Sequence, residues 1–237
     1  MNHSQLEQTF RQIGAQFVPD FENFAQRLGR IRAFVFDWDG VFNAGYKGEG
    51  TPSPFSEPDS MGTNLWRFAY WLQNGMLPVF AVITGAPNPT AIELATREHW
   101  DAVYFKIRDK ATAVKHLCQA HQLSPEQVAC SFDDINDLGM AEICGLRSLV
   151  RRQSSPLYRA FALTHQRCDY ITASEGGQHA VRELCELWMG TIGQYEAALQ
   201  SRIAFDQHYQ QYFAQRQQRN TLFFTQNTPE DIIPAMV

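Results

Sequence analysis

Two aspartates, Asp37 and Asp39, close an apolar run that begins at residue 31 and are well placed for chemistry. If this run forms a buried parallel strand, the two carboxylates point to the same side, because side chains two residues apart share a face. Neighbouring carboxylates repel each other, and both stay ionised only when a cation or a shared proton relieves them. An Asp-Gly turn explains Asp39 and Gly40 but not Asp37. The pair therefore indicates a functional site.

A third carboxylate, that of Asp133, directly follows a second apolar run. Asp134 and Asp137 also suit the start of a helix, the first as an N-cap and the second as an acidic residue in the first turn. Asp133 has no such explanation, and we expect its strand to end at the same edge of the sheet as the first. Several carboxylates with other oxygen ligands are typical of Mg²⁺. The sequence therefore predicts a Mg²⁺ site with Asp37, Asp39 and Asp133.

Groups suited to a phosphate follow two other predicted strands. Thr84 and Gly85 end an apolar run, and a hydroxyl followed by glycine before a helix can bind an oxyanion. Asp109 is a natural N-cap, which puts Lys110 in the first helical turn, at the positive end of the dipole. A lysine there is mildly unfavourable, so an anionic partner is one explanation and a solvated surface lysine is the other.

The composition excludes several classes of protein. The chain has 237 residues, 44% hydrophobic and 19% charged, with a net charge of −5, as in ordinary soluble domains without an electrostatic affinity for nucleic acid. We find no apolar run of about 18 residues, so we expect no membrane span. Five scattered cysteines and no visible secretory signal predict reduced thiols in the cytoplasm.

Strand and helix patterns alternate along the middle of the chain. Short buried strands are expected at 31–37, 77–83, 102–105, 128–132 and 146–150, and helices at 60–74, 89–99, 110–121 and 137–144. This alternation predicts an α/β fold with a doubly wound, Rossmann-like parallel sheet. In such sheets a ligand lies beyond the carboxyl ends of the strands, where the acidic residues fall.

Three segments lie outside this alternation. Residues 4–28 carry an apolar stripe at helical spacing that Pro19 should kink or split, and 42–58 is a Gly- and Pro-rich flap or hairpin. Residues 178–219 are expected to form one or two helices, and the last dozen residues could be disordered. We therefore divide the chain into an N-terminal helical extension, a phosphatase-like domain and a C-terminal helical extension, at 1–30, 31–190 and 191–237.

The order of these motifs resembles the haloacid dehalogenase superfamily of phosphotransferases. The resemblance covers about residues 31–190 and is carried by Asp37-Trp-Asp39-Gly40, Val82-Ile83-Thr84-Gly85, Lys110 and Asp133-Asp134-x-x-Asp137. Within the superfamily the chain looks most like the capless branch typified by 3-deoxy-D-manno-octulosonate 8-phosphate phosphatase. Stretches 125–129, 168–172 and 176–183 support that branch. The resemblance implies a Mg²⁺-dependent phosphatase that acts on a small soluble phosphate ester, such as a sugar-acid phosphate.

The residue types and the resemblance together assign roles to the predicted site. Asp37 is the nucleophile that forms an aspartyl-phosphate, and Asp39 is the general acid and base. The metal is held by Asp37, Asp133 and the main-chain carbonyl of Asp39, while Asp134 and Asp137 support the site. Thr84, Gly85 and Lys110 bind the phosphoryl oxygens.

The chain also departs from the family pattern. Phe132 stands before the aspartates where the family usually has glycine. Arginines that help the sugar phosphatases recognise an acidic sugar are replaced by Ala86 and Gln178. Residues 151–169 look longer than the family pattern, and a replacement cation is sought among Arg151, Arg152 and Arg159.

The partners of the chain stay open at this point. The family flap packs against a neighbouring subunit, so we expect a homo-oligomer, most simply a tetramer, unless the terminal helices fold over their own subunit. One alternative function is a binding or regulatory protein that kept the fold and lost turnover. Another is a phosphatase that acts on a protein-borne phosphate and docks its partner on the terminal helices.

Overall fold

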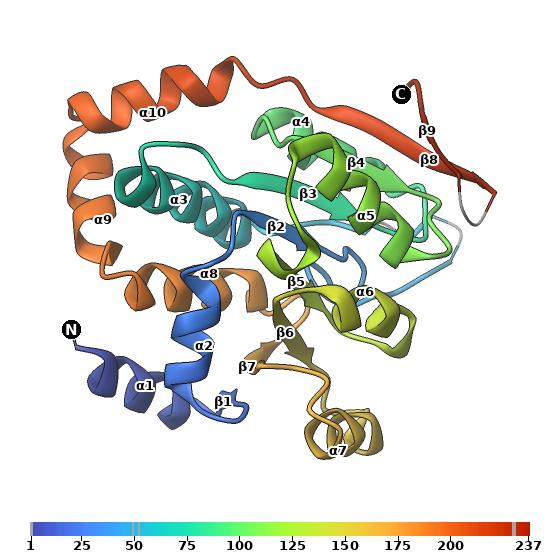
Figure 1. The fold of residues 1–237 in the computed structure, drawn as a ribbon, viewed down its shortest axis with the longest axis horizontal. Helices are drawn as coiled ribbons and strands as arrows, with labels where there is room; N and C mark the ends of the chain where they lie inside the picture. Colours follow the sequence, from blue (N-terminus) through green and yellow to red (C-terminus); the bar gives the residue numbers. More distant parts are fainter. Residues whose placement is uncertain (1, 49, 52, 229–230) are drawn as a thin grey trace.

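A computed structural model describes residues 2–48, 50–51, 53–228 and 231–237 of the chain. Within these residues a central sheet has the strand order β1-β7-β6-β5-β2-β3-β4-β8-β9 (Figure 1). Its strands are β1 Gln16–Phe17, β2 Ala33–Phe36, β3 Val79–Ile83, β4 Ala102–Phe105, β5 Val128–Phe132, β6 Leu146–Arg151, β7 Tyr170–Glu175, β8 Leu222–Thr228 and β9 Asp231–Pro234. Strands β2 to β8 pair in parallel, whereas β1 and β9 pair antiparallel at the two edges.

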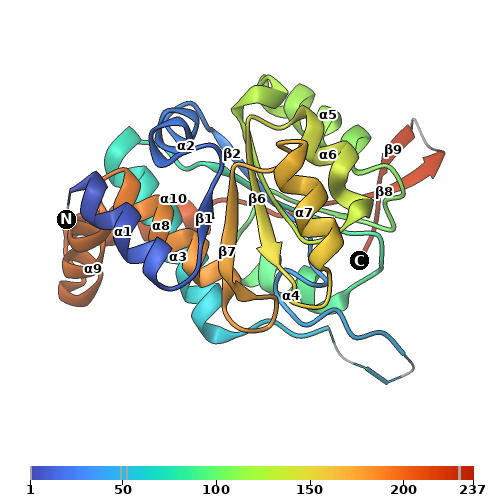
Figure 2. The same ribbon diagram turned by 90° about the horizontal axis from the view of Figure 1, so that it is seen from below.

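Helices cover both faces of the sheet, as a doubly wound fold requires (Figure 2). The helices are α1 His3–Gln12, α2 Phe21–Leu28, α3 Glu57–Asn74, α4 Pro89–Arg97, α5 Lys110–His121, α6 Leu138–Ile143, α7 Pro156–Thr164, α8 Ala180–Thr191, α9 Tyr195–Ala204 and α10 Gln207–Gln217, with short 3-10 turns at Pro125–Gln127 and Ile135–Asp137. Side chains of α5, α6 and α7 form one core cluster, and those of the other helices form a larger one on the opposite face. The predicted α/β fold is therefore confirmed.

The predicted strands and helices of the middle region are present with small shifts at their ends. Strands β4 and β5 and helix α5 have the predicted bounds. Helix α3 starts earlier than predicted because the Ser56 hydroxyl caps the Asp59 amide and Pro58 is tolerated in the first turn. Our sequence patterns missed α7 and β7, although β7 pairs with β6 inside the sheet. Among the described residues, no helix is long and apolar enough to span a bilayer.

The N-terminal apolar stripe splits at Pro19, as predicted. Helix α1 leads into β1, which pairs with β7, and α2 follows. The aromatic side chains Phe10, Phe17, Phe21 and Phe24 are all buried in the larger core cluster. The stripe therefore packs largely against its own sheet.

The C-terminal extension differs from its prediction. Three helices, α8, α9 and α10, take the place of one or two, and the chain then returns to the sheet as β8 and β9. The predicted helical extension is thus wrong beyond Gln217, and the described part of the last dozen residues contains strand. Phe223 and Phe224 face opposite sides of the sheet, which strand periodicity explains once the edge of β4 offers hydrogen bonds. That edge is formed by residues about 120 positions earlier, and local patterns do not reveal it.

The segment predicted as a hairpin or flap, residues 42–58, connects β2 to α3. Its described residues between Ala44 and Ser56 form an irregular loop without paired strands; residues 49 and 52 lie outside the described part. The loop is tied to the fold by the Trp38 indole, whose Nε1 donates to the Ser53 carbonyl oxygen at 2.9 Å. The term flap therefore fits its position, but the hairpin is not formed.

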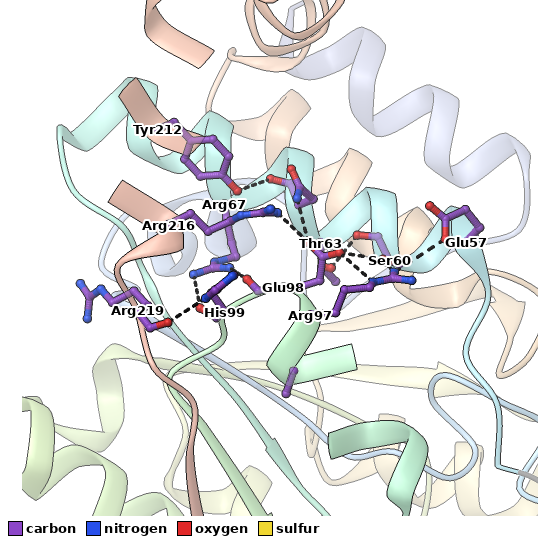
Figure 3. Close-up of polar contacts among 12 residues, drawn as sticks. Glu57, Ser60, Thr63, Arg67, Arg97, Glu98, His99, Tyr212, Arg216 and Arg219 are labelled. Carbon is purple, nitrogen blue, oxygen red and sulfur yellow. Dashed lines mark hydrogen bonds and ion pairs between the residues drawn. The ribbon is translucent and has the colours of Figure 1, made fainter. Parts of the chain in front are cut away.

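A buried polar network fixes α10 against α3 and the α4–β4 loop (Figure 3). The Arg216 guanidinium donates to the Glu98 carboxylate at 2.7 Å, and the fully buried Arg67 donates to the main-chain oxygens of Glu98 and His99 at 2.5 and 3.0 Å. The Arg219 carbonyl lies 2.8 Å from His99 Nδ1. Because buried charges are stable only when paired, this network holds the segment leading into β8 in a defined place.

Candidate functional site

A polar pocket of about 420 Å³ opens at the carboxyl edge of the sheet, beyond β2, β3 and β5. All eight predicted site residues share this location: Asp37, Asp39, Thr84, Gly85, Lys110, Asp133, Asp134 and Asp137 line it together. The predicted convergence of strand ends is therefore present, with no predicted site residue elsewhere in the fold. The structure additionally places Lys47, Arg108 and Arg152 on its wall.

Three buried carboxylates in the pocket are close enough to share one cation. Oxygens of Asp37, Asp133 and Asp137 all lie within 4.8 Å of one another. Asp137 therefore joins the acidic cluster, although the sequence assigned it only a supporting role. The side chain of Asp39 points elsewhere, so its predicted contribution through the main-chain carbonyl stays a prediction.

Glycine makes the close approach around the aspartates possible. At Gly40, φ is +91°, and a Cβ there would lie 2.0 Å from Asp133 Oδ2. At Gly176, in the turn after β7, a Cβ would lie 2.0 Å from the Gly40 carbonyl oxygen. Side chains at either position would push the loop after β2 away from β5 and β7. These glycines thus set the distance between Asp37 and Asp133.

Lys110 lies in the first turn of α5 and extends into the acidic cluster. Asp109 caps the helix by accepting from the Ala111 amide at 3.0 Å, as predicted. The Lys110 ammonium donates to Asp37 Oδ1 at 2.6 Å and to Asp137. The residue is only 7% exposed, which rules out the solvated surface lysine that the sequence left open. Burial alone would lower the pKa of Lys110, but the two carboxylates raise it above its ordinary value.

The carboxyl groups of the cluster titrate differently from that of Asp39. Burial, together with the nearby Asp137 carboxylate, raises the pKa of Asp37 to about 8. Burial also raises the pKa of Asp133 to about 6, although the hydrogen bond from Arg152 opposes that shift. Burial acts in the same direction on Asp39, but hydrogen bonds from Lys47 and Asn88 outweigh it and lower the pKa of Asp39. The positive charges near Asp37 and Asp133 are thus too few to offset the effect of burial on these two carboxyl groups. Hydrogen bonds from Lys47 and Asn88, in contrast, hold Asp39 as a carboxylate.

Asn88 is a site residue that the sequence analysis missed. Its Nδ2 donates to Asp39 Oδ2 and to Thr84 Oγ1, both at 2.8 Å, so it links the ends of β2 and β3. The residue precedes α4 with φ of 33°, a left-handed conformation that asparagine tolerates better than most residues. The Asn-Pro pair at the helix start was the available signal.

The structure also selects among the three candidate replacement cations. Arg152, in the turn after β6, donates to Asp133 Oδ2 and lines the pocket. Arg151 uses its main-chain amide on Thr172 Oγ1 at 2.9 Å, and Arg159 borders a separate small cavity behind Asp133. Ala86 lines the acidic pocket, whereas Gln178 lines a groove between α1 and α8. Arg152 is therefore the candidate that reaches the site.

Comparisons with known proteins agree with this geometry. No family model matches the chain. It is 29% identical over 180 residues to 3-deoxy-D-manno-octulosonate 8-phosphate phosphatase from Yersinia pestis, covering 74% of this chain and 88% of that protein. A haloacid dehalogenase superfamily (subfamily III A) hydrolase from Legionella pneumophila superposes with a TM-score of 0.64 at 25% identity, covering 77% of this chain and 95% of the other.

A second similar structure contains bound ligands. The 3-deoxy-D-manno-octulosonate 8-phosphate phosphatase from Moraxella catarrhalis, in complex with magnesium, phosphate and the sugar acid, superposes with a TM-score of 0.64 at 26% identity. The match covers 77% of this chain and 99% of that one. The shared fold, the sequence similarity over most of the relative and the clustered motif residues all point the same way. The chain is thus similar to haloacid dehalogenase superfamily hydrolases and, among them, to the 3-deoxy-D-manno-octulosonate 8-phosphate phosphatases.

Proposed function

We propose that the protein hydrolyses a small sugar phosphate, through an aspartyl-phosphate and with Mg²⁺ as cofactor. The observation that carries this proposal is the convergence of Asp37, Asp39, Thr84, Lys110 and Asp133 on one pocket. A nucleophile, an acid–base group and phosphate-binding groups thus lie within reach of a single phosphoryl group. The similarity to sugar phosphate phosphatases supports the choice of substrate class.

The buried acidic cluster fits a hard divalent cation. Asp37 and Asp133 would hold Mg²⁺, with Asp137 within reach, and all three offer oxygen ligands. The raised pKa values of Asp37 and Asp133 indicate that these carboxyls need more positive charge than Lys110 and Arg152 supply. When bound, the ion would neutralise negative charge on the phosphoryl group and on its acidic neighbours. The magnesium in the Moraxella relative supports this assignment.

The remaining steps belong to side chains of the chain itself. Asp37 attacks phosphorus and expels the sugar alkoxide, and water then hydrolyses the aspartyl-phosphate. Asp39 is held as a carboxylate by Lys47 and Asn88, which suits it to accept the proton of that water. A substrate that draws Lys47 to itself raises the pKa of Asp39, so that Asp39 takes up a proton from solvent water before the attack, gives it to the leaving alkoxide and is again a carboxylate when the hydrolytic water arrives. Thr84 and Lys110 bind the phosphoryl oxygens.

The cations on the pocket wall favour a substrate with a second anionic group. Lys47 from the flap, Arg108 before α5 and Arg152 after β6 line the pocket from three sides. The phosphoryl group itself is already served by Lys110, so these three cations would face the leaving group, which competes with Asp39 for Lys47 and with Asp133 for Arg152. A sugar acid phosphate would offer these cations a carboxylate. Arg152 would then take the role of the family arginines that are replaced by Ala86 and Gln178 in this chain.

A substrate panel tests the proposal. The purified chain is assayed with Mg²⁺ against sugar phosphates, sugar-acid phosphates, nucleotides and phosphoamino acids, and Asp37→Asn is the control. We expect the highest kcat/KM on a sugar-acid phosphate and less than about a tenth of that turnover in the variant. Turnover retained by Asp37→Asn would refute the nucleophile. Activity only on phosphoamino acids or phosphoproteins would favour a protein-borne substrate. Inactivity on all compounds would favour a binding or regulatory protein.

We also infer a cytoplasmic location and a homo-oligomeric state. All five cysteines are free and buried in the structure, which fits a reducing compartment. The flap leaves the pocket open to one side and exposes Tyr46 to 75%, so a neighbouring chain has room to cover it. Covering the site would shield the aspartyl-phosphate from bulk water.

A further inference from the structure

Strand β8 is an addition to the sheet that lies beyond the region of motif resemblance. It pairs in parallel with β4, the strand that leads to Lys110 (Figure 1). Phe224 of β8 stacks on Tyr104 of β4 with ring centroids 5.0 Å apart and contacts His116 of α5 at 4.7 Å. The buried network around Glu98 fixes the preceding helix, α10 (Figure 3). The strand is therefore held firmly against the element that carries the phosphate-binding lysine.

Gln226 of β8 connects this addition to the pocket. Its Oε1 accepts from the main-chain amides of Arg108 and Asp109 at 2.7 and 3.3 Å. Side chains two apart on a strand share a face, so Gln226 and Phe224 both face α5. The two amides belong to the turn that immediately precedes Lys110.

The turn at 106–109 is held from the other side by the loop after β3. The Ile107 amide donates to the Thr84 carbonyl oxygen at 3.1 Å, and the Lys106 amide to that of Ala86 at 3.4 Å. Lys106 adopts φ of 56°, a conformation that needs such support. The turn is thus fixed between β3 and β8, and Asp109 at its end caps α5.

We propose that Gln226 is a positioning residue for phosphate binding: by fixing the turn at 106–109, it holds the first turn of α5 so that Lys110 meets the phosphoryl group. This inference rests on the proposed function, because it assigns a role at the same pocket. Gln226 acts through the backbone and does not touch the substrate.

Three variants separate positioning from general stability. Gln226→Met removes the acceptor at similar side-chain length, Gln226→Glu retains an acceptor, and Asn227→Ala removes an exposed amide on the opposite face of β8. Hydrogen exchange of the Arg108 and Asp109 amides reports on the turn. Calorimetric titration with inorganic phosphate in Mg²⁺ reports on binding without turnover, and kcat and KM are measured on the best substrate.

We expect Gln226→Met to speed exchange of the two amides and to weaken phosphate binding about threefold to tenfold, the usual range for one hydrogen-bond acceptor. For Gln226→Glu and Asn227→Ala, we expect the exchange rates of the two amides and the affinity for phosphate to stay within about twofold of wild type. Unchanged exchange in Gln226→Met, or faster exchange with unchanged phosphate binding, overturns the inference. A wild type that binds phosphate in this Gln226-dependent way but hydrolyses none of the panel overturns the proposed function alone. A wild type that binds no phosphate overturns both.

Discussion

At the scale of single residues, the site brings several acidic side chains together in a small buried volume. Asp37, Asp133 and Asp137 lie within 4.8 Å of one another, and Lys110 and Arg152 compensate them in part. Burial and the neighbouring Asp137 carboxylate keep the pKa of Asp37 far above that of an exposed aspartate. The folded protein without metal thus favours the protonated form of Asp37, whereas the unfolded chain ionises it near its ordinary pKa.

This imbalance predicts how Asp37→Asn changes stability with pH. A raised pKa in the folded state means that wild type loses stability as pH rises from about 4 to about 8, because the unfolded chain releases the proton first. The amide of the variant has no proton to lose. In EDTA, the variant should gain about 1–3 kcal/mol over wild type between about pH 5 and about pH 8.5. Urea unfolding of both proteins at both pH values measures this difference in stability. A difference that does not change with pH would contradict the raised pKa of Asp37.

Asp133 and Asp134 are adjacent, yet the structure gives them different tasks. Asp133 is buried in the acidic cluster, while the exposed Asp134 accepts from the Ile135 amide at 2.7 Å. Asp133→Ala should raise the Mg²⁺ concentration for half-maximal activity at least about tenfold by removing a ligand oxygen. Asp134→Ala should leave it unchanged and cost about 1 kcal/mol of stability by removing a cap. Mg²⁺ titrations of activity and thermal unfolding distinguish the two variants. A shifted Mg²⁺ requirement in Asp134→Ala alone would exchange the roles of the two residues.

At the scale of elements, the site depends on how closely two turns approach. The turn after β7 meets the loop after β2 at Gly176, where main-chain atoms of Gly40 and Asn43 leave no space for a side chain. Backbone, unlike a flexible side chain, cannot move aside without shifting Asp39. The packing of these two elements is therefore part of the geometry of the candidate site.

Gly176→Ala tests this contact. Its Cβ would sit 2.0 Å from the Gly40 carbonyl oxygen, so the loops must separate. We expect a loss of about 1–3 kcal/mol of stability and at least about a tenfold loss of kcat. Gly139→Ala is the matched control, because a Cβ there meets nothing within 4 Å and helix α6 favours alanine over glycine. Thermal unfolding and steady-state kinetics of both variants check the prediction, which fails if the two behave alike.

At the scale of the whole molecule, the terminal extensions complete the two edges of the sheet. Strand β1 pairs with β7 at one edge, and β8 and β9 extend the other beyond β4. The apolar stripe of α1 and α2 is largely buried within the same chain. Exposed apolar residues remain on the flap, at Tyr46, and around the end of α9, at Ile203 and Phe205.

The oligomeric state stays a prediction of its own. We expect a tetramer in which the flap of each chain contacts a neighbour and the neighbour partly covers the pocket. Sedimentation velocity gives the mass, and Tyr46→Glu on the exposed flap should shift it toward the monomer and lower the specific activity. Sedimentation of wild type as a monomer at full specific activity would contradict the prediction.

Local sequence patterns were enough to predict the core of the sheet and the chemical groups at its edge. Apolar runs ending in Asp37 and Asp133, and the capped helix that starts at Lys110, are local patterns, and local sequence decides strand ends and helix starts. Parallel topology then brings strand ends together, which is why the sequence predicts that these residues share one edge of the sheet.

Tertiary structure decided what depends on residues far apart in the chain. It alone placed Asp137 beside Lys110, brought Arg152 rather than Arg151 or Arg159 to the pocket, and turned the predicted helical tail into β8. A strand at the edge of a sheet exists only because its neighbour offers hydrogen bonds, and a surface arginine becomes a site residue only when the fold points it inward. Such contacts join positions that no local window of sequence contains.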